Sequence, residues 1–398
     1  MDDITNLETI NVGIVGHIDH GKTTLLYKLS GKWTDTHSEE LKRGITIKLG
    51  YSDVVIKDED GKLTVKADST GKPLKYVTFV DAPGHEMLMA TMLSGAAIMD
   101  AAILVVAANE GIKPQTREHL TALKAKGINK VIIVQNKIDL VSKEKAVQNY
   151  KDIKTFVKGT IAENSPIIPV SAQQEINIEK ILQELVKIKV ERTDSKETIF
   201  LIARSFDINK PGTELAKLHG GVLGGALRSG KLKIGDTIEI KPGYSFKKQN
   251  KTIYQTVQTK IVSMQKGEHK VTEALPGGSL AIETELDPSL TKSDSLSGCI
   301  CSTPGTLPEI TETIKIKFNL FDSFYTNEQE EKVAELKTSE PLMLSINTST
   351  TVGLVTKIKN KEADIALKIP VVPLKGDSIG IARNVKNHWR LIGFGEIV

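Results

Sequence analysis

The chain has 398 residues, of which 39% are hydrophobic and 26% charged, a composition typical of a globular protein with two or three domains. Its formal net charge of +4 is too small to indicate a nucleic-acid partner by itself. The first residues, MDDITNLETIN, are acidic and polar, which excludes a signal peptide. The longest apolar run, from Ile98 to Ala108, is shorter than the roughly 20 residues of a membrane span. We therefore expect a cytoplasmic protein with no membrane partner.

The first half of the chain alternates short apolar runs with amphipathic segments. One such segment places Ala146, Tyr150, Ile153 and Val157 three or four residues apart, which predicts a helix. Alternation of this kind predicts an α/β fold with a mainly parallel sheet and helices on both faces. The expected strands are Val12–Val15, Tyr76–Val80, Ala102–Ala107, Val131–Gln135 and Ile167–Val170.

From Ile199 onward the hydrophobic period falls to two and glycines cluster, which predicts an antiparallel β-barrel. The pattern breaks near Thr303–Pro308 and restarts, which predicts a second barrel. Its expected strands are Thr313–Leu320, Leu342–Asn347, Ala363–Ile369 and Ser378–Asn384. The expected domains are a nucleotide-binding domain over residues 7–196 and two barrels over residues 197–308 and 309–398.

Two further segments carry expectations. The polar stretch from Lys57 to Lys75 is expected to form an exposed hairpin or a flexible loop. The two cysteines, Cys299 and Cys301, cannot build a disulfide framework or a four-cysteine zinc site. We expect them to be reduced thiols in a barrel strand, and we expect no bound zinc.

Residues 16–23, GHIDHGKT, fit the GxxxxGK[ST] phosphate-loop pattern. They follow the apolar strand NVGIV and open the amphipathic segment TTLLYKLSG, as the pattern requires. Glycines let backbone amides curl around phosphate oxygens at the positive end of a helix. Lys22 is expected to reach the β- and γ-phosphates, and the Thr23 hydroxyl to bind Mg²⁺. The other nucleotide contacts expected in this loop are Asp19, His20, Gly21 and Thr24.

Phosphate loops also occur in ATPases and small-molecule kinases, so a second motif is needed to predict which nucleotide base is bound. Asn136, Lys137 and Asp139 belong to NKID at the end of the run VIIVQ. A carboxylate there can accept two hydrogen bonds from the N1–H and amine of guanine, a donor pair that adenine lacks. The expected ligands are therefore GTP and GDP. The third segment, which places a backbone amide near the guanine O6, is Ser171-Ala172-Gln173.

The segment DAPGH follows the strand VTFV and is expected to face the γ-phosphate. Asp81 would hold Mg²⁺ through water, Gly84 would donate its backbone N–H to the γ-phosphate, and His85 would orient the attacking water. Thr46, in RGIT, would bind Mg²⁺ only while GTP is present, which makes residues 34–46 a switch. The expected catalytic set is Lys22, Thr46, Asp81 and His85.

With these motifs in order, the chain resembles the translational GTPases. The segments GHIDHGKTTL, RGIT and DAPGH are typical of the group that includes elongation factor Tu. Longer segments are similar to the gamma subunits of archaeal and eukaryotic translation initiation factor 2. They are TDTHSEELKRGITIKLGY, MDAAILVVAANEGIKPQTREHL, VKGTIAENSPIIPVSA, RSFDINKPGTE, GGVLGGALRSGKLKIGDTIEI, LDPSLTKSD and WRLIGFGEI.

The resemblance implies a G domain followed by two β-barrels. It also implies GTP-dependent delivery of methionyl initiator tRNA to the small ribosomal subunit, within a heterotrimer with alpha and beta subunits. By the same resemblance Asp19 and Gly44 would help hold metal beside Thr23 and Thr46. One departure is clear: relatives often carry a cysteine zinc knuckle before DAPGH, and residues 51–81 contain no cysteine or histidine.

Three alternatives stay open at this point. An elongator-type or selenocysteine-specific factor would share the G domain, and the segments matched in the later domains argue against it. A scaffold that binds GTP without useful hydrolysis is disfavoured by Thr46 and His85. A metabolite kinase sharing the phosphate loop is disfavoured by the guanine motif and the two barrels.

Overall fold

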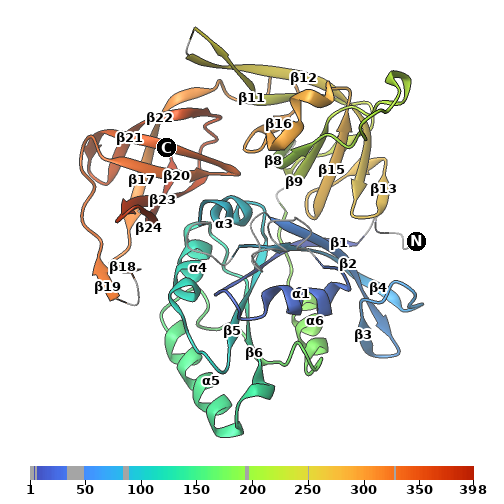
Figure 1. The fold of residues 1–398 in the computed structure, drawn as a ribbon, viewed down its shortest axis with the longest axis vertical. Helices are drawn as coiled ribbons and strands as arrows, with labels where there is room; N and C mark the ends of the chain where they lie inside the picture. Colours follow the sequence, from blue (N-terminus) through green and yellow to red (C-terminus); the bar gives the residue numbers. More distant parts are fainter. Residues whose placement is uncertain are drawn as a thin grey trace.

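The structure is a computed structural model that describes residues 4, 7–33, 49–83, 89–192, 197–249, 251–326 and 329–398. The chain forms an N-terminal α/β domain followed by two closed antiparallel β-barrels, which sit together on one side of it (Figure 1). The predicted fold class is therefore confirmed. In the described part of the chain, no helix is long and apolar enough to cross a membrane.

The N-terminal sheet has the strand order β3-β2-β4-β1-β5-β6-β7. Strands β4, β1, β5, β6 and β7 run parallel, while β2 and β3 form an antiparallel edge. The parallel strands are almost continuously buried, as expected for a sheet covered on both faces. The strands are β1 (Glu8–Gly16), β2 (Gly50–Glu59), β3 (Lys62–Thr64), β4 (Lys72–Asp81), β5 (Ala101–Ala107), β6 (Val131–Asn136) and β7 (Ile167–Pro169).

Helices cover both faces of this sheet. Helices α1 (Lys22–Ser30) and α6 (Ile178–Lys187) pack into the core on one face. Helices α3 (Met89–Ala96), α4 (Pro114–Ala125) and α5 (Lys143–Val157) contribute to the core on the other face, which continues into the barrels. The sheet therefore presents the carboxyl ends of its parallel strands at one edge, where loops of several motifs converge.

The first barrel, barrel II, closes through six strands in the order β11-β16-β8-β9-β15-β12, with β12 pairing back to β11. Its strands are β8 (Ile199–Phe206), β9 (Val222–Ser229), β10 (Leu232–Lys233), β11 (Thr237–Lys248), β12 (Lys251–Lys266), β13 (His269–Val271), β14 (Glu273–Ala274), β15 (Ser279–Thr284) and β16 (Ile300–Ser302). Cys299 and Cys301 are free, buried thiols; Cys301 lies in β16, and Cys299 immediately precedes it.

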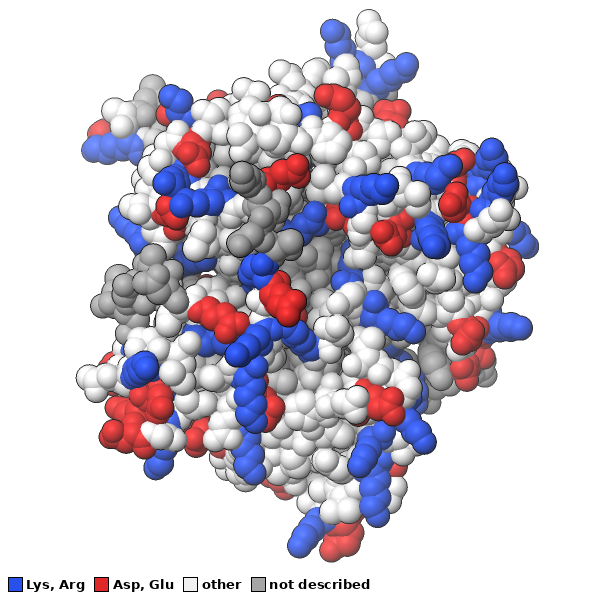
Figure 2. All heavy atoms as spheres, turned by 180° about the vertical axis from the view of Figure 1, so that it is seen from behind, with Lys and Arg blue, Asp and Glu red and all other residues white. Residues whose placement is uncertain are grey.

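The second barrel, barrel III, closes in the order β17-β22-β21-β20-β23-β24. The strands expected in it are confirmed within a few residues at each end. They are β17 (Thr311–Leu320), β20 (Pro341–Ile346), β22 (Glu362–Val371) and β23 (Ser378–Val385). Two strands of the barrel, β21 (Ser349–Lys359) and β24 (His388–Ile397), were not expected, and β18 (Ser323–Thr326) and β19 (Gln329–Lys332) form a small side sheet. Figure 2 shows basic and acidic side chains interspersed over one face of the molecule, in keeping with the small net charge.

The segment from Lys57 to Lys75 forms a hairpin, as one of the two expected alternatives, between the end of β2 and β3, and then leads into β4. It is less exposed than expected at its base. Lys57 is only 2% exposed, and its ammonium donates hydrogen bonds to the carbonyls of Ala67 and Ser69. A buried lysine is tolerated here because its charge is hydrogen-bonded.

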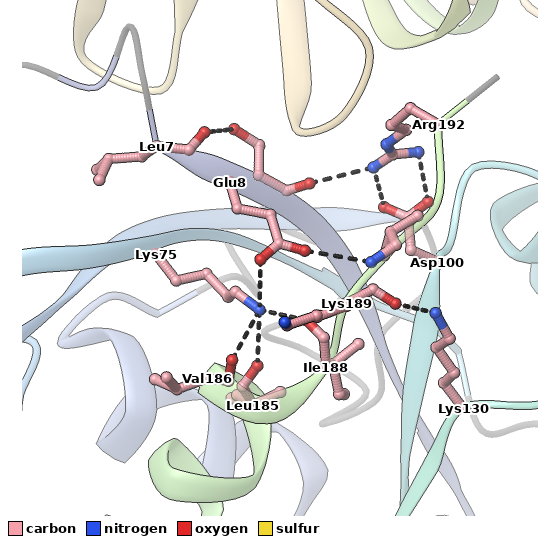
Figure 3. Close-up of polar contacts among 12 residues, drawn as sticks. Leu7, Glu8, Lys75, Asp100, Lys130, Leu185, Val186, Ile188, Lys189 and Arg192 are labelled. Carbon is pink, nitrogen blue, oxygen red and sulfur yellow. Dashed lines mark hydrogen bonds and ion pairs between the residues drawn. The ribbon is translucent and has the colours of Figure 1, made fainter. Parts of the chain in front are cut away.

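The segment that leads from the G domain to barrel II is fastened by Arg192 (Figure 3). Its guanidinium makes two hydrogen bonds of 2.7 Å to the carboxylate of Asp100. It also donates to the carbonyl of Thr9, at the start of β1. A bidentate pair of this kind holds the geometry of both partners more tightly than a single hydrogen bond does.

Lys75 of β4 holds the end of α6 through its ammonium group (Figure 3). It is 2% exposed, and its ammonium is 3.3 Å from a carboxylate oxygen of Glu8. Helix C-termini leave carbonyls without partners, and a cation is favoured beside them. The carbonyls that accept from this ammonium are those of Leu185, Val186 and Ile188.

The turn between β20 and β21 lies where all three domains meet. Ser94 of α3 donates a hydrogen bond of 2.6 Å to the carbonyl of Thr348 in this turn. The hydroxyl of Thr348 donates in turn to the carbonyl of Ile202 in β8, at 2.8 Å. Arg228 of β9 pairs with Asp377 of barrel III at 2.8 Å. One short turn thus connects the G domain and both barrels.

Candidate nucleotide-binding site

The phosphate loop, residues 16–23, runs from the end of β1 to the start of α1. Gly21 precedes the helix with φ of 86°, a left-handed conformation that favours glycine. Gly16 packs so closely on β5 that a Cβ would lie 2.4 Å from the carbonyl oxygen of Val105. These glycines let the backbone turn tightly enough to leave its amides available at the N-terminus of α1.

The side chain of Asn136 links its own motif to the phosphate loop and to the segment Ser171-Ala172-Gln173. Its amide nitrogen donates to the carbonyl of His20 at 2.9 Å, which ties it to the phosphate loop. Its amide oxygen accepts from the backbone N–H of Ala172 at 3.0 Å, which ties it to the third motif. Asn136 is 2% exposed. The structure therefore brings together the segments that the sequence separates by more than a hundred residues.

The two charged residues after Asn136 lie toward solvent. Lys137 adopts a left-handed φ of 61°, and its ammonium is 3.5 Å from the carboxylate of Glu110. Asp139 follows in the short 3₁₀ turn η2 (Ile138–Leu140) and is exposed. Gln173 is exposed as well. An exposed Asp139 at the carboxyl end of β6 is accessible to a ligand at that edge of the sheet.

Lys22 folds back over the phosphate loop. Its ammonium donates a hydrogen bond of 2.8 Å to the carbonyl of His17, although the residue is only 7% exposed. At the start of α1, Thr23 and Thr24 are half-buried, and Asp19 is exposed with φ of 61°. The positive charge of Lys22 thus lies over the loop whose amides would face phosphate.

Two oxygen atoms that can bind a metal ion lie close together beside this loop. The hydroxyl of Thr23 lies 3.4 Å from a carboxylate oxygen of Asp81, at the end of β4. Hydroxyl and carboxylate oxygens are the ligands that Mg²⁺ prefers, so the donor set fits this ion. Among the residues that the structure covers, no group of three or more His, Cys, Asp or Glu side chains is placed to hold a metal. The expected ligands Gly44 and Thr46, and the expected γ-phosphate contacts Gly84 and His85, lie outside the described residues.

The side chain of His20 does not face the loop's open side. It is fully buried, with Nδ1 3.3 Å from the carbonyl of Val105 and Nε2 3.9 Å from Glu110. Burial lowers the pKa of His20 to about 3, so the ring is neutral. Any contact of this residue with a nucleotide would use its backbone, and its ring serves the packing of the loop on β5.

The sequence did not single out two residues that support the site. His119 of α4 is buried and accepts a hydrogen bond of 2.8 Å from the backbone N–H of Gly16. Burial lowers the pKa of His119 to about 3. Glu110, described above beside His20 and Lys137, is the second. The only sequence signal for His119 is its place three residues after Thr116 and four before Leu123, on the buried face of α4.

Comparison with known proteins adds to this geometry. Residues 7–190 match the family described as the elongation factor Tu GTP binding domain, and residues 312–397 match the C-terminal domain of initiation factor eIF2 gamma. The translation initiation factor 2 subunit gamma of Methanococcus maripaludis is 52% identical over 99% of both chains. That of Methanocaldococcus jannaschii is 51% identical over 98% of this chain and 97% of its own.

The chain belongs to the family of translation initiation factor 2 gamma subunits. It is a translational GTPase, and its first domain binds GTP and GDP as that family does. The resemblance stated from the sequence is confirmed.

Solved structures show the same fold in other factors. A bacterial selenocysteine-specific elongation factor, EF-Sec, superposes with a TM-score of 0.77 at 26% identity, and the chain spans 58% of that protein's length. The elongation factor SelB of Methanococcus maripaludis, in complex with the GTP analogue GppNHp, superposes with a TM-score of 0.74 at 23% identity. At that identity SelB supports the fold alone.

Proposed function

We propose that this gamma subunit carries methionyl initiator tRNA to the small ribosomal subunit while GTP is bound. It would act in the cytoplasm as part of a heterotrimer with the alpha and beta subunits of the same factor. Hydrolysis of GTP to GDP and phosphate would release the tRNA. The observation that carries this proposal is identity of about half of all residues to gamma subunits along the whole chain.

The chemistry of the site is proposed residue by residue. Asp139 would bind the guanine base, with Lys137 and the amides of Ser171, Ala172 and Gln173 around it. Lys22 would neutralise charge on the β- and γ-phosphates, which the amides of the phosphate loop, residues 19–24, would also contact. The side chain of Asn136 supports this assignment because it holds the base and phosphate segments together.

Mg²⁺ would neutralise charge on the β- and γ-phosphates. Thr23 would bind it directly and Asp81 through water, as their 3.4 Å separation supports, and Thr46 would join them in the GTP state. Asp19 and Gly44 would contribute to a further metal site. Gly84 would contact the γ-phosphate, and His85 would orient the water that attacks it.

A second candidate is an elongator-type or selenocysteine-specific carrier, because the solved structures that superpose include a selenocysteine-specific elongation factor. The two candidates differ in the tRNA that they select. Identity of 52% to gamma subunits against 26% to EF-Sec favours the first. Pull-down with initiator tRNA and with elongator tRNAs separates them, since an initiation factor retains the initiator species alone.

The test of the switch is the affinity for initiator tRNA with GTP, with GDP and with no nucleotide. A ligand shifts an equilibrium only by its differential affinity for the two states. We expect affinity about 10- to 100-fold higher with GTP, the scale of common coupling energies. Thr46→Ala should shrink that ratio and leave GDP affinity nearly unchanged. Equal affinity of the wild type for initiator tRNA with GTP and with GDP would contradict the proposed switch.

A further inference from the structure

The hairpin formed by β11 and β12 extends beyond the wall of barrel II. Figure 1 shows its end projecting at the top of the molecule, far from α1 and the nucleotide site. Between Glu239 and Glu268 the sequence holds six lysines and no aspartate or glutamate. In Figure 2 the same projection, at the top of the view, carries basic side chains. Four of these lysines, Lys247, Lys248, Lys251 and Lys260, are exposed, so positive charge gathers on this hairpin although the net charge of the chain is only +4.

Two of its lysines face each other across the strands. The strand register places Lys248 directly opposite Lys251, and Lys247 lies on the other face of the same strand. All three are exposed, and none of the residues that the structure describes forms an ion pair with them. Like charges directly opposite each other across two strands are unfavourable. An anionic partner would offset the repulsion between these two lysines.

A second hairpin of the same chain shows that the fold does not require this arrangement. In β21 and β22 of barrel III, Lys359 lies opposite Glu362, and Lys357 lies opposite Asp364. Both strand lysines next to that turn therefore have an acidic residue as their register partner, while Lys361 lies in the turn itself. Both hairpins have exposed ends, and they differ in the charges that they pair.

Apolar side chains adjoin the lysines on one face. Phe246 lies opposite Ile253, which is 38% exposed. The ring of Tyr244 stacks on that of Phe246 with centroids 5.4 Å apart. Aromatic side chains beside lysines are the elements with which proteins bind single-stranded nucleic acid, since bases stack on the rings while cations contact the phosphates.

We propose that the end of the β11–β12 hairpin is an RNA-binding arm. Lys247, Lys248 and Lys251 would contact phosphates, and an unpaired base would lie against Phe246 and Ile253. The apolar face beside the lysines favours RNA over an acidic protein surface, because a base can stack there while the neighbouring phosphates contact the lysines. This arm is independent of the GTP-coupled site proposed above, so its RNA affinity is the same with GTP and GDP.

The test uses the full chain loaded with GDP and a labelled single-stranded RNA of about 20 nucleotides, with affinity measured by anisotropy at several salt concentrations. The test variant is Lys248→Gln with Lys251→Gln, and the matched control is Lys357→Gln with Lys359→Gln, which removes the same charge from the other hairpin. We expect the test variant to bind about tenfold or more weakly. The slope of log affinity against log salt should fall by about 1.4, or about 0.7 for each lost phosphate contact. The control should stay within about twofold.

A second variant separates binding from folding. Lys251→Glu places an acid opposite Lys248, so its melting temperature should equal or exceed that of the wild type while RNA affinity falls. Equal losses of RNA affinity in the double Gln variant and its control would overturn the proposal of an RNA-binding arm. So would competition by polyglutamate as strong as that by RNA of equal charge, since the hairpin would then be a docking surface for acidic protein.

Discussion

Asn136 makes two hydrogen bonds with its side-chain amide, and each reaches a different loop. The motif predicted its presence near guanine, whereas its role as a connector follows from geometry. A Cβ on Gly21 would lie 2.4 Å from the amide nitrogen of Asn136, so glycine at that position makes room for the connector. At the scale of single residues, the phosphate loop and the guanine motif are therefore interdependent.

The base preference belongs to Asp139. If its carboxylate pairs with the two guanine donors, Asp139→Asn should weaken GTP and favour xanthosine triphosphate. Losing charge-assisted hydrogen bonds costs about 2–4 kcal/mol, or roughly 30- to 1,000-fold in affinity. Titration of both nucleotides against wild type and variant checks this. Asp152→Asn, on the exposed face of α5, is a matched control. Unchanged GTP affinity in the variant would remove the guanine assignment.

The buried ring of His119 makes stability depend on pH. Its pKa is about 3 in the folded chain and 6.5 in an ordinary setting, so between these values only the unfolded state binds a proton. Stability is therefore highest above pH 6.5 and falls as pH falls toward 3. Between pH 7 and pH 5 this histidine alone costs about 2 kcal/mol. His119→Asn keeps an acceptor for Gly16 and removes the titration. Urea unfolding at pH 7 and pH 5 gives the stability that each protein loses between these pH values. The variant should lose about 2 kcal/mol less than the wild type. An identical loss in both proteins would contradict the assignment to His119.

At the scale of elements, the sequence predicted the strands of the parallel sheet, four strands of barrel III and the presence of barrel II, because hydrophobic period is local. The antiparallel edge strand β2 was not predicted, because its residues 50–59 mix polar and apolar side chains without a strict alternation. Partners far apart in the chain were not predicted either. Gly16 and His119 are 103 residues apart, and Lys75 and Leu185 are 110 apart. Such pairs depend on how helices pack on the sheet, which no single segment specifies.

Lys75 offers a test of how β4 and α6 are joined. Lys75→Met removes the donor from the last carbonyls of α6 and should destabilise the chain by about 2–3 kcal/mol. Lys72→Met, at an exposed position of the same strand, should change stability by less than about 0.5 kcal/mol. Urea unfolding gives the stabilities, and hydrogen exchange should show faster opening of α6 in Lys75→Met alone. Unaltered exchange in α6 would mean that other contacts hold the helix end.

At the scale of the whole molecule, the three domains share an apolar core, and polar contacts around the β20–β21 turn also join them. The hydroxyl of Thr348 contacts barrel II, and its carbonyl accepts from the G domain. Burial lowers the pKa of Lys126, which reaches from α4 to the carbonyl of Ser345, to about 7. A nucleotide-dependent change near α3 would therefore reach the parts of both barrels that adjoin this turn, which is the connection that a GTP-coupled carrier requires.

Thr348→Val tests whether this turn makes the three domains unfold together. The substitution keeps the shape and removes the donor to the carbonyl of Ile202, which should cost about 1–3 kcal/mol. Thr351→Val is the matched control, since Thr351 is equally buried and bonds to Ile369 within barrel III. Both variants should be destabilised to a similar extent. Thermal melts followed by calorimetry and by circular dichroism should show two transitions for Thr348→Val, because barrel II is then less strongly coupled to the other domains. Thr351→Val should keep a single transition. A single transition in both would show that the apolar contacts between domains, rather than this turn, make the molecule cooperative.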